Sequence, residues 1–261
     1  MDYQNIILEI DGPKAKICLN RPEVFHALNA SILEELASAF QELGENETIR
    51  VITLTATGAE AFCSGADLKE GMANAGRPLG EILAENYEPL IIGIRECPKP
   101  VICQMNGIAA GAGMSLALAC DLIIANDKAY MTELFVGIGL MPDAGSMYFL
   151  PRLVGVQKAF ELCSTGRKIY MEEALQLGLV SKVAPENELE ATVNQLTDYY
   201  ASAPTVAIAQ MKKVLNLTYE SSLQQMLASE AKGQTRCGFT EDFGEGVMAF
   251  LQKRKPEFKG K

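Results

Sequence analysis

Residues 100–125, PVICQMNGIAAGAGMSLALACDLIIA, contain two apolar runs joined by a segment rich in glycine and alanine. The runs over 101–105 and 121–125 are short and rich in β-branched residues, and proline or turn residues bound them, which predicts two buried strands. The small residues 111–120 between them predict a helix packed closely on a sheet. A strand, a helix and a strand in this order indicate a right-handed crossover, so the stretch predicts an α/β fold with a mainly parallel sheet.

The segments before this stretch extend the same pattern. Strands are expected at 5–10, 15–19 and 51–55, the first two forming a hairpin around the turn residues 11–14. Ser31 begins a capping-box match, which predicts a helix whose apolar positions recur at helical spacing. A second helix is expected over 79–97 and is ended by Pro98.

Beyond Val156 the pattern becomes almost wholly helical. Helices are expected at 156–164, 171–177, 186–202, 205–218, 221–233 and 240–253. No internal repeat or low-complexity tract interrupts them. We therefore divide the chain into an α/β core of residues 1–200 and a helical region of residues 201–261.

The net charge of the 261 residues is −10, which argues against nucleic acid or an anionic membrane as the main partner. A small anionic ligand needs only a local basic patch, for which Lys69 and residues 253–255 are candidates. No run approaches the roughly 20 apolar residues that span a bilayer, and the N-terminus has no signal-like pattern. A cytoplasmic location is expected.

The seven cysteines are odd in number and form no C-x-x-C pair, which predicts free thiols in a reducing compartment. Because His26 is the single histidine, a zinc site or a histidine-based triad is not expected. No metal is predicted.

Two glycine-containing turns follow predicted strands. Residues 61–70 form a small-residue turn whose backbone N–H groups can face a ligand, although such a segment is more often only a turn. Residues 106–116 lead into a helix, whose N-terminus suits an anion, although close helix–sheet packing explains the small residues equally well. A dinucleotide fingerprint is disfavoured, because Leu116 occupies the place of its third glycine.

Asp143 follows Pro142 in the third segment of interest, residues 139–146. It can be a turn former or helix N-cap, or a carboxylate whose pKa is raised by apolar neighbours and suited to proton transfer. Glu133 is a rival carboxylate, but it is expected to be a solvated charge. His26 is expected to be structural.

Several short motifs, which include these segments, follow one another in a fixed order along the chain. They are Arg21-Pro22, residues 62–68, 98–102, 106–113, Cys120-Asp121, 142–145 and 250–254. The ordered set resembles the crotonase (enoyl-CoA hydratase/isomerase) superfamily nearly end to end. The resemblance implies an α/β spiral of ββα units, followed by a C-terminal helical trimerisation region within residues 201–261. It also implies a homotrimer or a dimer of trimers.

The resemblance also implies an oxyanion hole made by two backbone N–H groups, which fall here on Ala66 and Ala112. Such donors would stabilise the enolate that forms on a thioester. Residues Ala66, Asp67, Leu68 and Lys69 would line the path of coenzyme A. Phe250 and Lys253 would reach its nucleotide end, from the same or a neighbouring subunit. Coenzyme A is then part of the acyl-CoA substrate, and no separate cofactor is implied.

Departures from the family pattern separate the possible reactions. The two glutamates that activate water in typical hydratases align here with Ser115 and Phe135, which cannot replace them. Residues 142–145 and 106–113 look most like the epoxyphenylacetyl-CoA isomerase branch, in which the aspartate matching Asp143 moves protons. His26 stands where many relatives have asparagine, and its effect on substrate choice is open.

We therefore predict an enoyl-CoA or epoxyphenylacetyl-CoA-type isomerase with Asp143 as the proton shuttle. One alternative is an enoyl-CoA hydratase of fatty-acid or aromatic-acid degradation. The other is a non-catalytic oligomer that binds coenzyme A.

Overall fold

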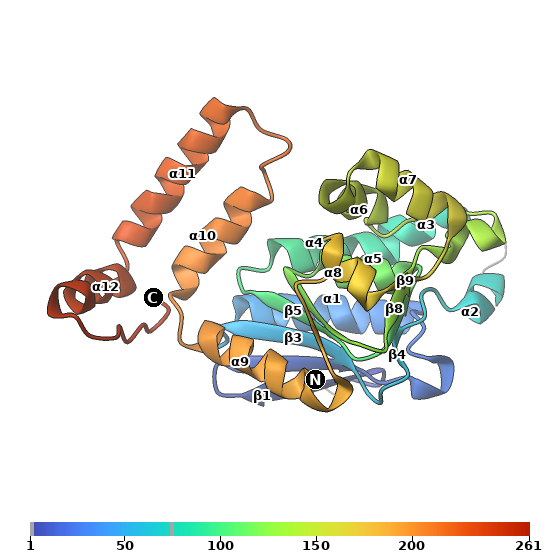
Figure 1. The fold of residues 1–261 in the computed structure, drawn as a ribbon, viewed down its shortest axis with the longest axis horizontal. Coiled ribbons are helices and arrows are strands. Elements are labelled where there is room, and N and C mark those ends of the chain that lie inside the picture. The colour runs from blue at the N-terminus through green and yellow to red at the C-terminus, as the bar shows by residue number, and fades with distance from the viewer. Residues whose placement is uncertain (1–2, 74–75) are drawn as a thin grey trace.

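The computed structural model describes residues 3–73 and 76–261 and contains a six-stranded sheet (Figure 1). Its strand order is β1-β2-β3-β5-β7-β10. The strands are Ile6–Asp11, Lys14–Leu19, Val51–Ala56, Val101–Met105, Leu122–Asn126 and Lys182–Ala184 in that order. Only β1 runs antiparallel to its neighbour, so the mainly parallel sheet and the N-terminal hairpin are confirmed.

A second, smaller sheet lies beside the first and was not predicted. It has the order β4-β6-β8-β9, from Ala61–Cys63, Ile108–Ala110, Tyr130–Thr132 and Ile169–Tyr170. The strands β4, β6 and β8 follow β3, β5 and β7 along the chain. The chain therefore passes from the large sheet to the small one in each successive turn of a spiral.

Helices cover both faces of the large sheet (Figure 1). On one face lie α1 (Ala30–Glu45), α4 (Glu88–Glu96) and α5 (Ala112–Ala119), and on the other lies α9 (Leu189–Ala201). Successive residues of a strand point to opposite faces, so Ile52 joins the main core while Val51 packs with Leu189 of α9. This packing holds the ends of β4 and β6 and the start of α5 in fixed positions.

The start of α1 differs from the prediction, and the helix predicted over 79–97 is present but less regular than expected. The N-cap of α1 is Asn29, whose side chain accepts the Ile32 N–H at 3.0 Å, while Ser31 lies inside the helix. The helix expected over 79–97 is α3 (Leu79–Ile82), a π-helical turn over Leu83–Tyr87, and α4. Pro89 explains the turn, because it has no N–H and its ring clashes with the carbonyl of a regular preceding turn.

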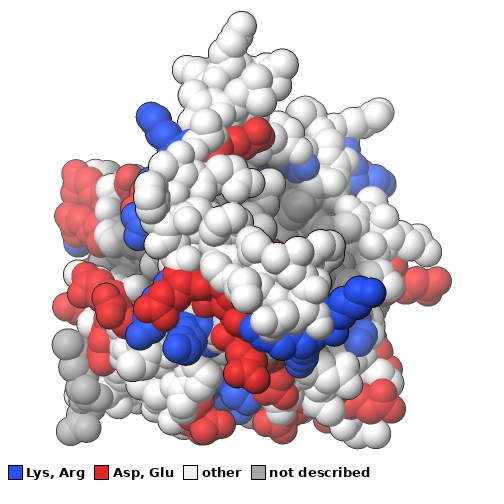
Figure 2. All heavy atoms as spheres, turned by 90° about the vertical axis from the view of Figure 1, so that its left-hand side faces the viewer, with Lys and Arg blue, Asp and Glu red and all other residues white. Residues whose placement is uncertain are grey.

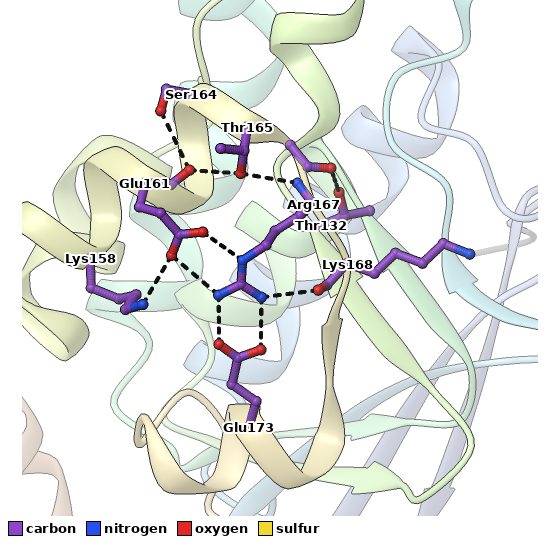
Figure 3. Close-up of polar contacts among 9 residues, drawn as sticks. Thr132, Lys158, Glu161, Ser164, Thr165, Arg167, Lys168 and Glu173 are labelled. Carbon is purple, nitrogen blue, oxygen red and sulfur yellow. Dashed lines mark hydrogen bonds and ion pairs between the residues drawn. The ribbon is translucent and has the colours of Figure 1, made fainter.

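The remaining core helices are α2 (Leu68–Ala73), α6 (Ser146–Val154), α7 (Val156–Thr165) and α8 (Met171–Gln176). Arg167 joins α7 to α8 through two carboxylates (Figure 3). Its guanidinium donates to Glu161 at 2.5 and 3.2 Å and to Glu173 at 2.8 and 2.6 Å. The bidentate geometry fixes the angle between the two helices.

The C-terminal helices are α10 (Thr205–Leu215), α11 (Leu223–Gly238) and α12 (Glu241–Gln252), and they project from the core (Figure 1). Buried Lys212 fastens α10 to the core of its own chain, because its ammonium donates to Asp121 at 2.7 Å and to the carbonyls of Ile94 and Lys99. The helical C-terminal region is thus observed, while the boundary at residue 200 stays a prediction. No helix within the described residues is long and apolar enough to cross a membrane.

Candidate active site

The turn after β4 leaves one backbone N–H group without a partner. The Leu28 N–H donates to the Gly65 carbonyl at 2.7 Å, and the Asp67 N–H donates to the Leu28 carbonyl at 2.9 Å. These bonds form a parallel bridge on either side of Ala66, so the N–H of Ala66 points away from Leu28. No described residue accepts a hydrogen bond from it, and Ala66 is exposed.

Ala112 is the first residue of α5, a position whose N–H has no acceptor within the helix. Gly111 donates to Thr132 at 2.9 Å, and Met114 and Ser115 donate to Gly111, whereas no described residue accepts a hydrogen bond from the N–H groups of Ala112 and Gly113. The Ala112 N–H therefore stays available at the positive end of the helix dipole.

Two glycines bring these amides together. A Cβ on Gly65, whose φ is +98°, would lie 3.4 Å from the Ala112 nitrogen and 2.8 Å from the Ala110 oxygen. A Cβ on Gly113 would lie 2.3 Å from the Cys63 oxygen. Only glycine allows β4 and α5 to approach so closely, and this approach places the predicted pair Ala66 and Ala112 side by side.

Asp143 lies in the turn before α6, but it is not the helix N-cap. The N-cap is Gly145, and no side chain caps the helix. One carboxyl oxygen of Asp143, Oδ1, is buried without a hydrogen-bond partner among the described residues. Burial raises the pKa of this carboxyl to about 6. The carboxyl can therefore change protonation state near neutral pH.

Glu133 is fully buried, so the expectation of a solvated charge is wrong. Its Oε1 lies 2.6 Å from the Ser146 hydroxyl, and its Oε2 is buried with no partner in the described chain. Burial, with a smaller contribution from the Asp143 charge, raises the pKa of Glu133 to about 7 although the Ser146 hydrogen bond lowers it. The sequence signal was available in the apolar residues around it, Met131 and Phe135.

Ser115 and Phe135 are the residues that we expect to align with the two hydratase glutamates. The Ser115 hydroxyl is buried and donates to the Asp143 carbonyl at 3.0 Å, and it lies 2.8 Å from the Ser146 hydroxyl. Phe135 is buried beside Gly111. These two positions therefore bring no charge to the site.

A cavity of about 620 Å³ adjoins the Asp143 turn. Its lining includes Leu83, Tyr87, Ile91, Ala144 and Phe149 and is largely apolar. Burial, and next the charge of Asp143, raise the pKa of Tyr87, so the phenol remains protonated near the carboxylate. The cavity suits an apolar chain or ring placed next to Asp143.

The residues predicted to bind coenzyme A fall into two separate groups. Asp67 forms an ion pair with Arg21 at 3.0 Å, whereas Leu68 and Lys69 are exposed beside it. Phe250, which is 82% exposed, and exposed Lys253 lie at the end of α12. Figure 1 shows α2 and α12 at opposite ends of the molecule, so one chain does not bring the two groups together.

His26 has a structural environment. Its Nδ1 accepts the Arg21 N–H at 3.1 Å, so its Nε2, 3.0 Å from the Thr57 carbonyl, carries the proton. Burial lowers the pKa of the ring. The neutral imidazole ties two turns together and presents no free nitrogen to a substrate.

Comparison with known proteins identifies the family. The family model for enoyl-CoA hydratase/isomerase matches residues 10–261. A "Probable enoyl-CoA hydratase" of Rhodobacter capsulatus is 43% identical over the whole of both chains. The 1,2-epoxyphenylacetyl-CoA isomerase of Escherichia coli is 35% identical over 98% of each chain.

The crystal structure of an enoyl-CoA hydratase from Bacillus anthracis has the same fold. It superposes with a TM-score of 0.94 at 35% identity, over 99% of this chain and 100% of that one. The expected crotonase-like architecture is thus confirmed, with its ββα spiral followed by C-terminal helices. By sequence and by fold, the chain belongs to the enoyl-CoA hydratase/isomerase family.

Proposed function

We propose that the protein binds an acyl-CoA thioester and stabilises its enolate with the N–H groups of Ala66 and Ala112. The observation that carries this proposal is the pair of unpartnered amides held together by Gly65 and Gly113. Donors fixed before reaction need no reorganisation when the thioester oxygen becomes negative, and each contributes about 3 kcal/mol in comparable sites. The chemistry requires no metal or redox cofactor.

We further propose that the reaction is isomerisation of a double bond, with Asp143 as the base. A carboxyl with a pKa of about 6 is mostly ionised at neutral pH and can take a proton from the substrate. It can then return the proton to another carbon of the same enolate. The uncharged residues at positions 115 and 135 support a single carboxylate that shuttles a proton rather than a pair that activates water.

The substitution Asp143→Asn tests this assignment, because it keeps the shape of the side chain and removes the base. We expect isomerisation of a 3-enoyl-CoA to fall by about 10² to 10⁴-fold with CoA binding retained. Asp127→Asn, on an exposed turn, is the matched control and should leave turnover unchanged. Near wild-type turnover in Asp143→Asn would remove the assignment.

Hydration is the second candidate reaction, and the Rhodobacter capsulatus relative named as a hydratase supports it. Incubation with crotonyl-CoA distinguishes the two, since hydration removes the conjugated double bond next to the thioester. Rapid loss of that absorbance would favour hydration. Binding of acyl-CoA without turnover of either substrate would favour the non-catalytic alternative.

We propose that the protein assembles through its C-terminal helices as a homotrimer or a dimer of trimers. Figure 2 shows a broad uncharged area on the face formed by these helices. Exposed apolar side chains on them include Met211, Leu215, Leu223, Phe239, Phe243 and Phe250. Such clusters mark protein interfaces. A neighbouring subunit would then carry Phe250 and Lys253 to the nucleotide end of a bound acyl-CoA.

A further inference from the structure

A chain of four polar groups runs through the buried region behind the Asp143 turn. Glu133 Oε1 lies 2.6 Å from the Ser146 hydroxyl, which lies 2.8 Å from the Ser115 hydroxyl. The Ser115 hydroxyl lies 3.0 Å from the main-chain carbonyl of Asp143. Glu133, Ser115 and Ser146 are each 0% exposed, and no ion pair within the described residues includes Glu133.

The hydrogens in this chain can be counted. Three contacts need three hydrogens, and the Asp143 carbonyl can only accept. The two serine hydroxyls supply two hydrogens, so all three contacts are hydrogen bonds only when the Glu133 carboxyl supplies the third. With Glu133 ionised, Ser146 would donate to Glu133, and Ser115 could donate to either Ser146 or the Asp143 carbonyl, which also accepts the Ser146 N–H at 3.0 Å. The Gly111 carbonyl, 3.4 Å from the Ser115 hydroxyl, is a longer alternative acceptor and supplies no hydrogen. An ionised Glu133 would leave one buried contact between two oxygens without a hydrogen, which is unfavourable.

We propose that Glu133 is a positioning residue that works in its protonated form. Its carboxyl donates to Ser146, Ser146 donates to Ser115, and Ser115 donates to the Asp143 carbonyl. The chain thereby fixes the turn that holds the Asp143 carboxyl next to the apolar cavity. The consequence for turnover rests on the proposed role of Asp143, whereas the protonation state of Glu133 does not.

Ionisation of Glu133 would disrupt this arrangement. The titratable groups that face it are Asp143, from the turn before α6, and Cys163 on α7, while α5 contributes only the Ser115 hydroxyl. With its pKa raised to about 7 by burial and next by the Asp143 charge, Glu133 loses its proton above neutral pH. A second negative charge then lies near Asp143 and the chain lacks one hydrogen. Because the two carboxyls interact, their apparent pKa values belong to the pair.

The variant Glu133→Gln tests the role in turnover, since its amide is always neutral and can donate to Ser146. We expect kcat/KM close to wild type at pH 6.5 and a loss of the wild-type decline above pH 7. Ser115→Ala cuts the chain without altering the carboxyl, so it should lower kcat about tenfold or more while the alkaline decline remains. A pH profile of Glu133→Gln that superposes on the wild type, or inactivity at every pH, would overturn the proposal.

Infrared difference spectroscopy tests the protonation state without any substrate. At pH 6.5 the wild type should show a band of a protonated carboxyl that persists in Asp143→Asn and in Ser115→Ala. The band should disappear when Glu133→Gln is added to Asp143→Asn. The band should titrate away with a midpoint near pH 7. Its absence from Asp143→Asn, in protein whose circular dichroism is native, would show that Glu133 is ionised and would overturn the proposal whatever the reaction proves to be.

Discussion

Ala112 stands at a helix position that tolerates proline, because the first residue of a helix has no intrahelical acceptor for its N–H. Gly111 precedes it, and a glycine adapts readily to the conformation that a following proline requires. The amide that we assign to enolate stabilisation can thus be removed while α5 is kept. Few oxyanion-type donors on a main chain allow this experiment.

For Ala112→Pro we predict a fall in kcat of about 10²- to 10³-fold, the usual effect of losing one such donor. Circular dichroism should show an unchanged helix content. Val156→Pro, at the first position of α7 and also after a glycine, is 77% exposed and provides a proline control that should retain full activity. Equal losses in both variants would point to a general effect of proline rather than to the lost N–H.

Sequence reasoning at the residue scale selected Asp143, whose catalytic role stays a prediction, but misjudged the burial of Glu133. Asp143 stands in a recognisable turn after Pro142, and its alternative reading as an N-cap was decided only by the position of Gly145. The burial of Glu133 depends on α5 and α6 packing over it from other parts of the chain. The only local sign of such packing is its apolar neighbours Met131 and Phe135, whereas the usual place of a glutamate is the solvent.

The contact between α7 and α8 shows how a single guanidinium can orient two short helices (Figure 3). Hydrogen bonds from Arg167 and Lys158 lower the pKa of Glu161 to about 2, and hydrogen bonds to Glu173 and Glu161 raise the pKa of Arg167. A carboxyl whose pKa is lowered in the folded state adds stability above its unfolded pKa of about 4.3. This stability is lost as the pH falls towards about 2.

For Arg167→Met we predict a loss of about 1 kcal/mol at pH 7, since the side chains are about one-third exposed and solvent weakens the ion pairs. The difference from wild type should shrink as the pH is lowered from about 4. Urea unfolding at several pH values measures both effects. Arg77→Met, which removes the more exposed pairs with Glu81 and Glu85, should change stability little. A pH-independent difference would contradict the electrostatic explanation.

The predicted elements were most accurate where hydrophobic periodicity was long. The strands β1, β2, β3, β5 and β7 and the longer helices gave clear patterns, whereas β4, β6, β8 and the unpredicted β10 have three residues each and are too short for any period to appear. The close approach of β4 to α5 was visible only as a run of small residues. The structure explains the glycine at position 113, because a residue with a side chain would clash with Cys63.

At the scale of the whole molecule, the docking of the C-terminal region depends on a buried charge. Sequence periodicity predicted α10 but not the side chain that fastens it, because a lysine on a helix normally faces solvent. Lys212 is instead 8% exposed and paired with Asp121. The position of α11 and α12 relative to the core follows from this attachment.

For Lys212→Met we predict a loss of about 1–3 kcal/mol in the free energy of unfolding, because the substitution leaves the buried carbonyls of Ile94 and Lys99 without the ammonium donor, while Asp121 keeps its ion pair with Arg95 at 3.6 Å. Lys213→Met, on the exposed side of the same helix, should cost almost nothing. Chemical denaturation of both variants at equal protein concentration measures the difference. A loss below about 1 kcal/mol for Lys212→Met would mean that apolar packing alone holds α10 in place.

The π-helical turn at Leu83–Tyr87 lines the cavity of about 620 Å³ beside the Asp143 turn, and it affects how the shape of that cavity can change during evolution. Each residue advances a helix by about 100° around its axis, so deleting one residue here would restore a regular helix and rotate everything before it by that amount. Gly80 would swing away from the cavity while Ile91 and Phe149 stayed in place. A one-codon deletion would therefore reshape this cavity in a single evolutionary step and leave Ile91 and Phe149 untouched.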